Sequence, residues 1–213
     1  MEINVKGSGS IKIAPDQVRL YLSFDYKAMS YEDALNQGTN NVNVFVNQIL
    51  IPNGFTIEDM KTTRFVIANN TEYNESTRKY VHVGYRFEQA SMIKFDYDKE
   101  KMASLMEQIS KLDNPPIYNV SFGVKDEESA RKDLLAKAYD DAKTKAEAIA
   151  AAAGKTIVEC VKVNFKSDDL EYTSKTGFYS REMAIGSKDG LMDTFTPEDI
   201  ELTENLYCLF ITN

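Results

Sequence analysis

The chain has 213 residues, and its 33 acidic and 25 basic side chains give it a formal net charge of −8 at pH 7. This charge, in a sequence without a clustered Lys/Arg segment, argues against nucleic acid and anionic membranes as partners. A hydrophobic fraction of 43% and clear periodicities predict a globular protein rather than a disordered one. The length suits one large domain over 1–213, or two intimately packed halves at about 1–95 and 96–213.

No apolar run is long enough to span a bilayer, so no membrane-spanning segment is expected. The N-terminal sequence MEINVKGSGS lacks the apolar core of an export signal, which predicts a cytoplasmic protein for the sequence as it stands. If a signal has been removed, we expect an exported protein, periplasmic or at the cell surface. Cys160 and Cys208 lie in strand-like runs, which predicts buried free thiols. A disulfide between them stays open if the two strands are neighbours.

Two strands are predicted at the start of the chain, at residues 3–13 and 17–27. In the second strand hydrophobic and polar residues alternate strictly, as on a half-buried strand. Pro15 predicts a turn between the two, so we expect them to form a hairpin. Gly7 and Gly9 interrupt the first strand, which indicates a bulge or a close approach of the backbone to another element.

The middle of the chain is predicted to alternate between helices and strands. Ser30 with Asp33 resembles a capping box that begins the first helix, and Pro52 with Gly54 ends it. The next two strands should form a hairpin around a polar loop at 70–77. The predicted helix covers residues 30–50, and the paired strands cover 61–69 and 78–95. A second helix at 98–111 and a further strand at 117–125 follow.

The clearest helix of the sequence covers residues 126–154. Asp126 is a good N-cap, and Gly154 can adopt the left-handed conformation that ends a helix. Acidic residues precede basic ones by four positions in several pairs, such as Asp141 and Lys145. A stripe of mostly small residues predicts close packing on a neighbouring layer; it consists of Leu134, Ala138, Ala142, Ala146, Ile149 and Ala153.

Strands at 156–166 and 200–212 complete the predicted order, which is ββαββαβαββ. This order predicts an α+β fold in which helices cover mainly antiparallel sheets. It also contains two candidate βαββ units, at roughly 17–95 and 117–212, whose residues do not match one another.

Residues 167–196 fit no periodicity, and a long irregular loop in a compact domain is often functional or disordered. Apolar side chains are scattered through it. One interpretation is a mobile surface loop, and the other is an assembly arm that packs on a neighbouring subunit. The residues that would make this contact are Tyr172, Phe178, Tyr179, Met183 and Met192.

No catalytic or metal-binding constellation stands out in the sequence. The single histidine, His82, lies on the polar side of a predicted strand, which favours a surface or packing role. One histidine and two distant cysteines do not fit a zinc site, and Asp168, Asp169 and Glu171 lack the pattern of a calcium loop. A catalytic pair formed by two carboxyl groups that are distant in the chain stays open as a possibility of the sequence. We therefore assign no catalytic residue, cofactor or metal.

Several residues along the chain carry a resemblance to a known family. On the long helix they are Ala138, Asp141, Ala142, Lys145, Ala146, Ala150 and Gly154. Elsewhere, in the same order as in the family, they are Gly7, Gly9, Pro15, Asp16, Gly54, Gly84, Tyr85 and the segment 197–200 before the last strand. Together they resemble the SIMPL-domain family over nearly the whole chain. That family includes periplasmic and outer-membrane immunogenic proteins of bacteria.

The resemblance implies a protein without an agreed catalytic set. It also implies assembly, because some relatives build ring- or channel-like oligomers, and a link to stress tolerance. Our leading hypothesis is therefore a non-enzymatic protein that acts through homo-oligomerisation or contact with another protein. The alternatives are a module that binds a small or lipid-like ligand between sheet and helices, and a hydrolase that uses paired carboxylates.

Overall fold

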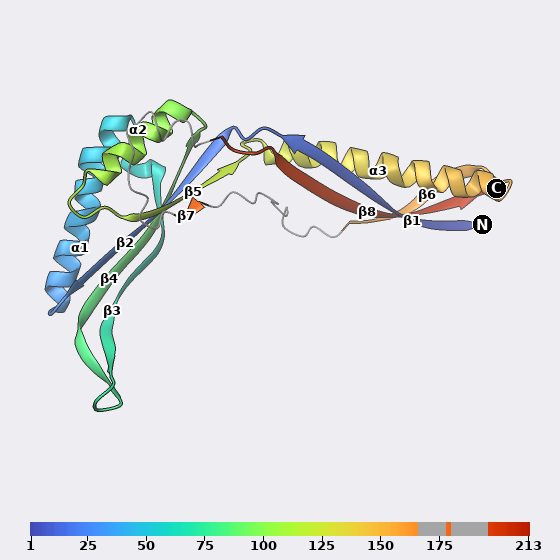
Figure 1. Cartoon of the computed structure of the whole chain (residues 1–213). Helices are drawn as coiled ribbons and strands as arrows, with labels where there is room; N and C mark the ends of the chain where they lie inside the picture. The colour runs from blue at the N-terminus through green and yellow to red at the C-terminus, as the bar shows by residue number, and fades with distance from the viewer. Residues whose placement is uncertain (166–177, 180–195) are drawn as a thin grey trace. The chain divides into compact units, whose positions relative to one another are not determined.

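The computed structural model describes residues 1–165, 178–179 and 196–213 (Figure 1). The chain divides into two compact units, and each contains one antiparallel sheet and at least one helix, which confirms the α+β prediction. The predicted boundary near residue 95 falls inside the second unit, because the units are built from interleaved parts of the chain. Unit 1 consists of Met1–Asp16, Gly123–Lys175 and Pro197–Asn213, and unit 2 of Gln17–Phe122 and Thr176–Thr196.

Unit 2 contains a sheet with the strand order β3-β4-β2-β5-β7. Its strands are β2 (Gln17–Ala28), β3 (Met60–Asn74), β4 (Lys79–Asp96), β5 (Ile117–Gly123) and β7 (Phe178–Tyr179). Its helices are α1 (Tyr31–Phe45) and α2 (Lys99–Ser110). The predicted pairing of β3 with β4 is confirmed, and β2 lies on the other side of β4.

Helix α1 begins and ends as its sequence predicts. The Ser30 hydroxyl oxygen accepts a hydrogen bond from the Asp33 amide at 3.0 Å, which satisfies a free N–H of the first turn. The helix continues through the π-helical turn Val46–Leu50 and the 3-10 turn Ile51–Asn53. Gly54 then takes a φ of 80°, the left-handed conformation that ends the helical run.

The core of unit 2 lies between the sheet and these helices. The alternating residues of β2 point into it, and α1 contributes Gly38 where the ring of Phe87 leaves no room for a side chain. The largest fully buried side chains of this core are Phe45, Phe87, Leu22, Leu50, Ile93, Met102, Ile109 and Val18.

Unit 1 contains a sheet with the order β1-β8-β6, on which one long helix lies. The strands are β1 (Glu2–Ile13), β8 (Ile200–Thr212) and β6 (Ile157–Asn164), and the helix is α3 (Glu127–Ala152). The Asp126 carboxylate accepts a hydrogen bond from the Ser129 amide at 2.8 Å, so the predicted N-cap is confirmed.

The predicted hairpin between the first two strands is wrong. β1 pairs instead with β8 along its whole length, from Glu2 opposite Ile211 to Ile13 opposite Ile200. The segment after Pro15 does not close a turn, because the Asp16 amide donates to the carbonyl of Gly123 and its carboxylate accepts from the amide of Lys125. These distant partners are invisible to local turn rules.

Of the two candidate βαββ units, only residues 17–95 keep their three strands in one sheet. In residues 117–212, β5 belongs to the sheet of unit 2, whereas β6 and β8 belong to the sheet of unit 1.

The small-residue stripe of α3 is present but lies slightly differently from the prediction. Ile149 is 46% exposed and Ala153 is also exposed, so these two assignments were wrong. A strict spacing of four residues replaces the predicted mixed spacing. The buried residues are Ala130, Leu134, Ala138, Ala142, Ala146 and Ala150.

The two glycines of β1 explain why the stripe consists of small residues. A Cβ atom placed on Gly7 would lie 1.9 Å from the Ala138 carbonyl oxygen, and one on Gly9 would lie 2.1 Å from that of Leu134. The strand backbone therefore contacts the helix backbone directly, and only glycine fits at these positions.

Two side chains of α3 cover the free edge of β1. The Asp141 carboxylate accepts a hydrogen bond from the Ser8 amide at 2.7 Å, and the Lys145 ammonium donates to the Lys6 carbonyl at 3.1 Å. The two side chains also form an ion pair at 2.6 Å. Backbone groups that an edge strand usually leaves open for another chain are thus satisfied within the unit.

We expect Gly7→Ala to destabilise the protein by about 1–3 kcal/mol, because the added methyl group forces the helix away from the strand. The matched control is Asn4→Ala on the exposed side of the same strand, which should change stability by less than about 0.5 kcal/mol. Urea unfolding of both variants measures the effect. Equal stability of Gly7→Ala and the wild type would refute the direct backbone contact.

We expect Asp141→Asn to lower stability at neutral pH and to have little effect in acid. Hydrogen bonds from the Lys145 ammonium and then the Ser8 amide hold the pKa of the Asp141 carboxyl below its ordinary value. The resulting stabilisation is present above the unfolded pKa of about 3.9 and is lost as the pH falls through the lower folded pKa. Urea titrations at a series of pH values measure the difference in stability between Asp141→Asn and the wild type, with the exposed Asp133→Asn as control. A difference in stability that does not change with pH would contradict a stabilising role of the ionised Asp141 carboxylate.

Candidate interaction surface

The residues predicted to form an assembly loop fall largely outside the part of the chain that the structure describes. Tyr172, Met183 and Met192 lie outside it, as do Asp168, Asp169 and Glu171. Phe178 and Tyr179 form the short strand β7, whose backbone pairs with Val120 and Asn119 of β5. The loop at 167–196 therefore stays a prediction as an assembly element.

A different segment, which the sequence did not single out, projects from unit 2. Pairing between β2 and β4 stops at Ala28 opposite Tyr85, whereas β3 and β4 continue to pair as far as Asn74 opposite Lys79. We call residues 69–84 the arm. Figure 1 shows the β3–β4 hairpin continuing past the end of β2 as a two-stranded ribbon. The predicted polar loop at 70–77 is thus wrong, since most of it belongs to a strand.

The ends of the arm are built by specific local geometry. At the tip, the Thr77 amide donates to the Asn74 side-chain oxygen at 3.0 Å, and Arg78 takes a φ of 53° to close the turn. At the base, Gly84 has a φ of 118° and passes so close to Ala28 that a Cβ would lie 2.3 Å from its carbonyl oxygen. The alternation of residues around Tyr73 and Tyr80 is the sequence pattern that could have predicted these strands. The asparagines at 69, 70 and 74 favour a turn, so the segment was predicted as a loop.

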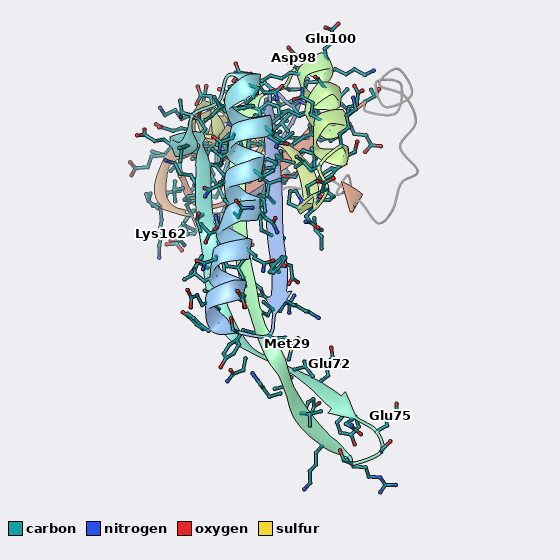
Figure 2. The ribbon with its side chains drawn as sticks, turned by 90° about the vertical axis from the view of Figure 1, so that its left-hand side faces the viewer. Met29, Glu72, Glu75, Asp98, Glu100 and Lys162 are labelled. Carbon is teal, nitrogen blue, oxygen red and sulfur yellow. The ribbon has the colours of Figure 1, made fainter. Side chains whose placement is uncertain are left out.

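The arm exposes aromatic and aliphatic side chains. Tyr73 is 52% exposed, Tyr80 is 74% exposed and Val81 is 43% exposed. The two tyrosine rings face each other across the strands, edge to face, with centroids 5.3 Å apart. Figure 2 shows the ribbon reaching out with Glu72 and Glu75 toward its end. In the described part of the chain, no third strand pairs with this ribbon.

The sequence-predicted His82 lies on the arm and is exposed. Its ring contacts Tyr85 edge to face at 5.1 Å, and Tyr85 in turn contacts Tyr31 at the start of α1 at 5.8 Å. The exposed Met29 precedes this cluster and is labelled in Figure 2. The aromatic contacts give His82 a packing role at the base of the arm.

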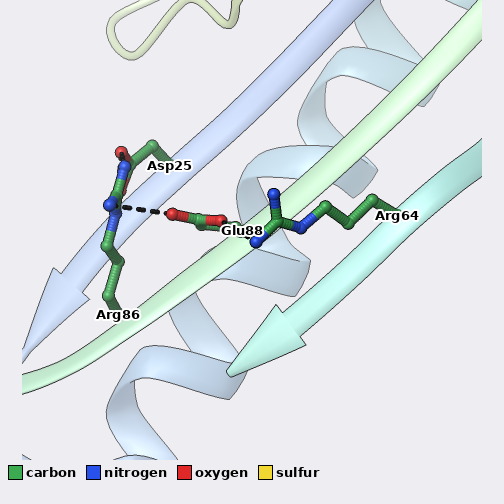
Figure 3. A network of polar contacts seen from close by, with 4 residues as sticks. All are labelled: Asp25, Arg64, Arg86 and Glu88. Atoms are coloured by element: carbon green, nitrogen blue, oxygen red, sulfur yellow. Dashed lines mark hydrogen bonds and ion pairs between the residues drawn. The ribbon is translucent and has the colours of Figure 1, made fainter. Parts of the chain in front are cut away.

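Below the arm, a charged network crosses three strands on the outer face of the sheet (Figure 3). Arg86 of β4 donates from its Nε to the Asp25 carboxylate of β2 at 3.0 Å, and its Nη1 lies 2.8 Å from Glu88. Glu88 lies 3.5 Å from Arg64 of β3. The hydrogen bonds that Arg86 donates to the Asp25 carboxylate raise the pKa of its guanidinium. Because neighbouring charges alternate in sign, the network holds the three strands together where the arm leaves the sheet.

A cavity of about 160 Å³ lies between β2, α1 and the loop at 114–116. Its lining mixes aromatic with polar groups: Phe24, Asp25, Tyr26, Gly38, Asn41, Phe87, Asn114, Pro115 and Pro116. Pockets for drug-sized ligands usually measure about 300–1,000 Å³. A larger, more open depression of about 470 Å³ is lined mostly by charged and polar residues at 56–61 and 92–94. Neither is a large apolar pocket of the kind expected for a lipid-like ligand.

Two described carboxyl groups have displaced pKa values, and both have structural causes. Hydrogen bonds from Thr56 lower the pKa of Asp59, which forms a capping box with that residue. Asp141 is held by Lys145 and Ser8, as described above. Each displaced pKa thus has a local cause within the unit that contains the group. No group of three metal-ligating side chains occurs among the described residues.

None of the helices in the described ranges has the length and apolar character needed to cross a membrane. No curated protein matches the sequence significantly. The model of the SIMPL family, described as proteins of unknown function (DUF541), matches residues 3–207. This match spans both units and includes the glycines of β1, the arm and the stripe of α3. The chain therefore belongs to the SIMPL family.

Proposed function

We propose that the protein acts through protein–protein contact, with a second copy of the chain as its partner, and that the arm makes this contact. The observation that supports the proposal is the extension of the β3–β4 hairpin beyond the rest of its sheet, with Tyr73, Tyr80 and Val81 exposed on it. A catalytic role is not needed to explain this feature.

The physical argument concerns the stability of the ribbon. A two-stranded hairpin is at best marginally stable in water by itself, because it buries little apolar surface. Its outer edges also leave backbone N–H and C=O groups free to pair with another strand. Tyrosine is enriched in interfaces because one end of its side chain is apolar and the other forms hydrogen bonds. Contact with a partner would supply the burial and pairing that the ribbon lacks.

The charge of the arm favours a second copy as this partner. The whole chain carries a net charge of −8, which opposes association between copies. Within the arm and its turn, Glu72 and Glu75 are balanced by Arg78 and Lys79. Two copies that meet through their arms therefore avoid the repulsion that most of the surface would cause.

Shortening the arm tests this proposal. Residues 72–81 are replaced by Asn-Gly, which joins Thr71 to its partner His82 through a two-residue turn suited to a hairpin. We expect the wild type to form a closed oligomer and the shortened chain to be monomeric. Size exclusion with light scattering over a wide concentration range measures the molar mass.

A matched pair of substitutions separates the aromatic contact from the loss of the ribbon. Tyr73→Ser combined with Tyr80→Ser should weaken association, whereas Tyr207→Ser, at a tyrosine of β8 that is 47% exposed, should not. A wild type that is monomeric at every concentration would overturn self-assembly. An oligomer that survives removal of the arm would overturn the role of the arm.

A further inference from the structure

The two cysteines of the chain meet in unit 1, on neighbouring strands. β6 pairs antiparallel with β8, with Cys160 opposite Phe210 and Val163 opposite Cys208. Cys208 and Phe210 are two positions apart on β8, so their side chains share one face. Both cysteines pack in the apolar cluster beneath α3, together with Tyr139 of that helix. The two strands that carry the cysteines are therefore neighbours, which is the condition for a disulfide between them.

The two cysteines are diagonal neighbours on one face of this strand pair, because Cys160 lies opposite Phe210, two positions from Cys208. Tyr139 of α3 packs against the same cluster. The Cys160 thiol lies 3.6 Å from the Lys162 carbonyl oxygen, where the pairing register shifts by one residue. Both cysteines are free thiols.

The environments of the two thiols differ in exposure. Cys208 is fully buried, with 0% of its surface exposed, whereas Cys160 is partly exposed near the edge of the sheet. Burial, followed by the proximity of Cys160, raises the pKa of the Cys208 thiol. An oxidant from solvent thus reaches Cys160 first.

We propose that Cys160 and Cys208 form a dithiol that a peroxide oxidises to an intramolecular disulfide, with Cys160 as the attacking thiol and Cys208 as the resolving thiol. The disulfide joins the edge strand β6 to the central strand β8. Tyr139 is a positioning residue, because it packs against the same cluster as the two cysteines. This proposal is independent of the arm and of assembly.

The reaction balances with one peroxide molecule as the oxidant. The Cys160 thiolate attacks one oxygen of hydrogen peroxide, the O–O bond breaks, and the departing hydroxide takes up a proton to give water and a sulfenic acid. The Cys208 sulfur then attacks the Cys160 sulfur, the S–O bond breaks, and a second water leaves. The two thiols together lose two protons and two electrons, which reduce the peroxide to two water molecules. Because the two residues are diagonal neighbours on paired strands, disulfide formation requires their Cβ atoms to approach to about 3.5–4.5 Å.

The experiment treats the reduced full-length protein with hydrogen peroxide and follows it by intact mass and peptide mapping. We expect the wild type to lose two hydrogen atoms and to yield a peptide in which Cys160 is joined to Cys208 of the same chain. The Cys208→Ser variant should stop at a sulfenic acid on Cys160 that dimedone traps. The Cys160→Ser variant should keep its Cys208 thiol, because burial protects that group. Tyr139→Phe should slow disulfide formation without preventing it.

Mapping of the wild type decides the proposal even if a variant fails to fold, which circular dichroism detects. Oxidation of Cys160 to a sulfinic acid beside a free Cys208 would overturn the pairing, as would disulfides that link two copies of the chain. Preferential oxidation of Cys208 in the wild type would overturn the order of attack.

Discussion

Unit 1 depends on the direct contact between the backbone of β1 and the backbone of α3. Gly7 and Gly9 supply the room on the strand, and the alanine stripe supplies it on the helix. Because the two backbones touch, Asp141 and Lys145 reach the free edge of β1 and satisfy its amide and carbonyl groups. The same approach leaves β8 enclosed between two strands and a helix, and β8 carries the buried Cys208.

In unit 2, by contrast, part of the strand backbone extends beyond the sheet. Its core is made by large side chains between sheet and helices, and the charged network of Asp25, Arg86, Glu88 and Arg64 ties the outer face together. Beyond that network no third strand pairs with the arm among the described residues. In unit 1, side chains cover a strand edge. In unit 2, a strand pair extends into solvent, where its backbone is available for contact with another chain. This contrast is the physical basis of the proposed assembly.

The sequence predicted the elements well because their signals are local. The caps of α1 and α3, the alternation of β2 and the order of helices and strands depend on residues within a few positions of one another. The closeness of Gly7 and Gly9 to another element was also indicated, although not which element. The predicted assembly residues Tyr172, Met183 and Met192 lie outside the described ranges, so that part of the site remains a prediction. Resemblance to the SIMPL family, read from scattered glycines and alanines, was confirmed by the match over residues 3–207.

What only the tertiary structure decided concerns pairing between distant segments. The sequence by itself determined most of the residues that form strands, but strand partners are chosen by shape and hydrogen bonding over the whole chain. β1 pairs with β8 along its length, and its glycines pack against the α3 stripe. The arm was missed because a loop and a polar strand have similar compositions, and only the pairing of Tyr73 with Tyr80 distinguishes them. The meeting of Cys160 and Cys208 follows from the register of β6 on β8, which two bulges shift and which no local pattern encodes.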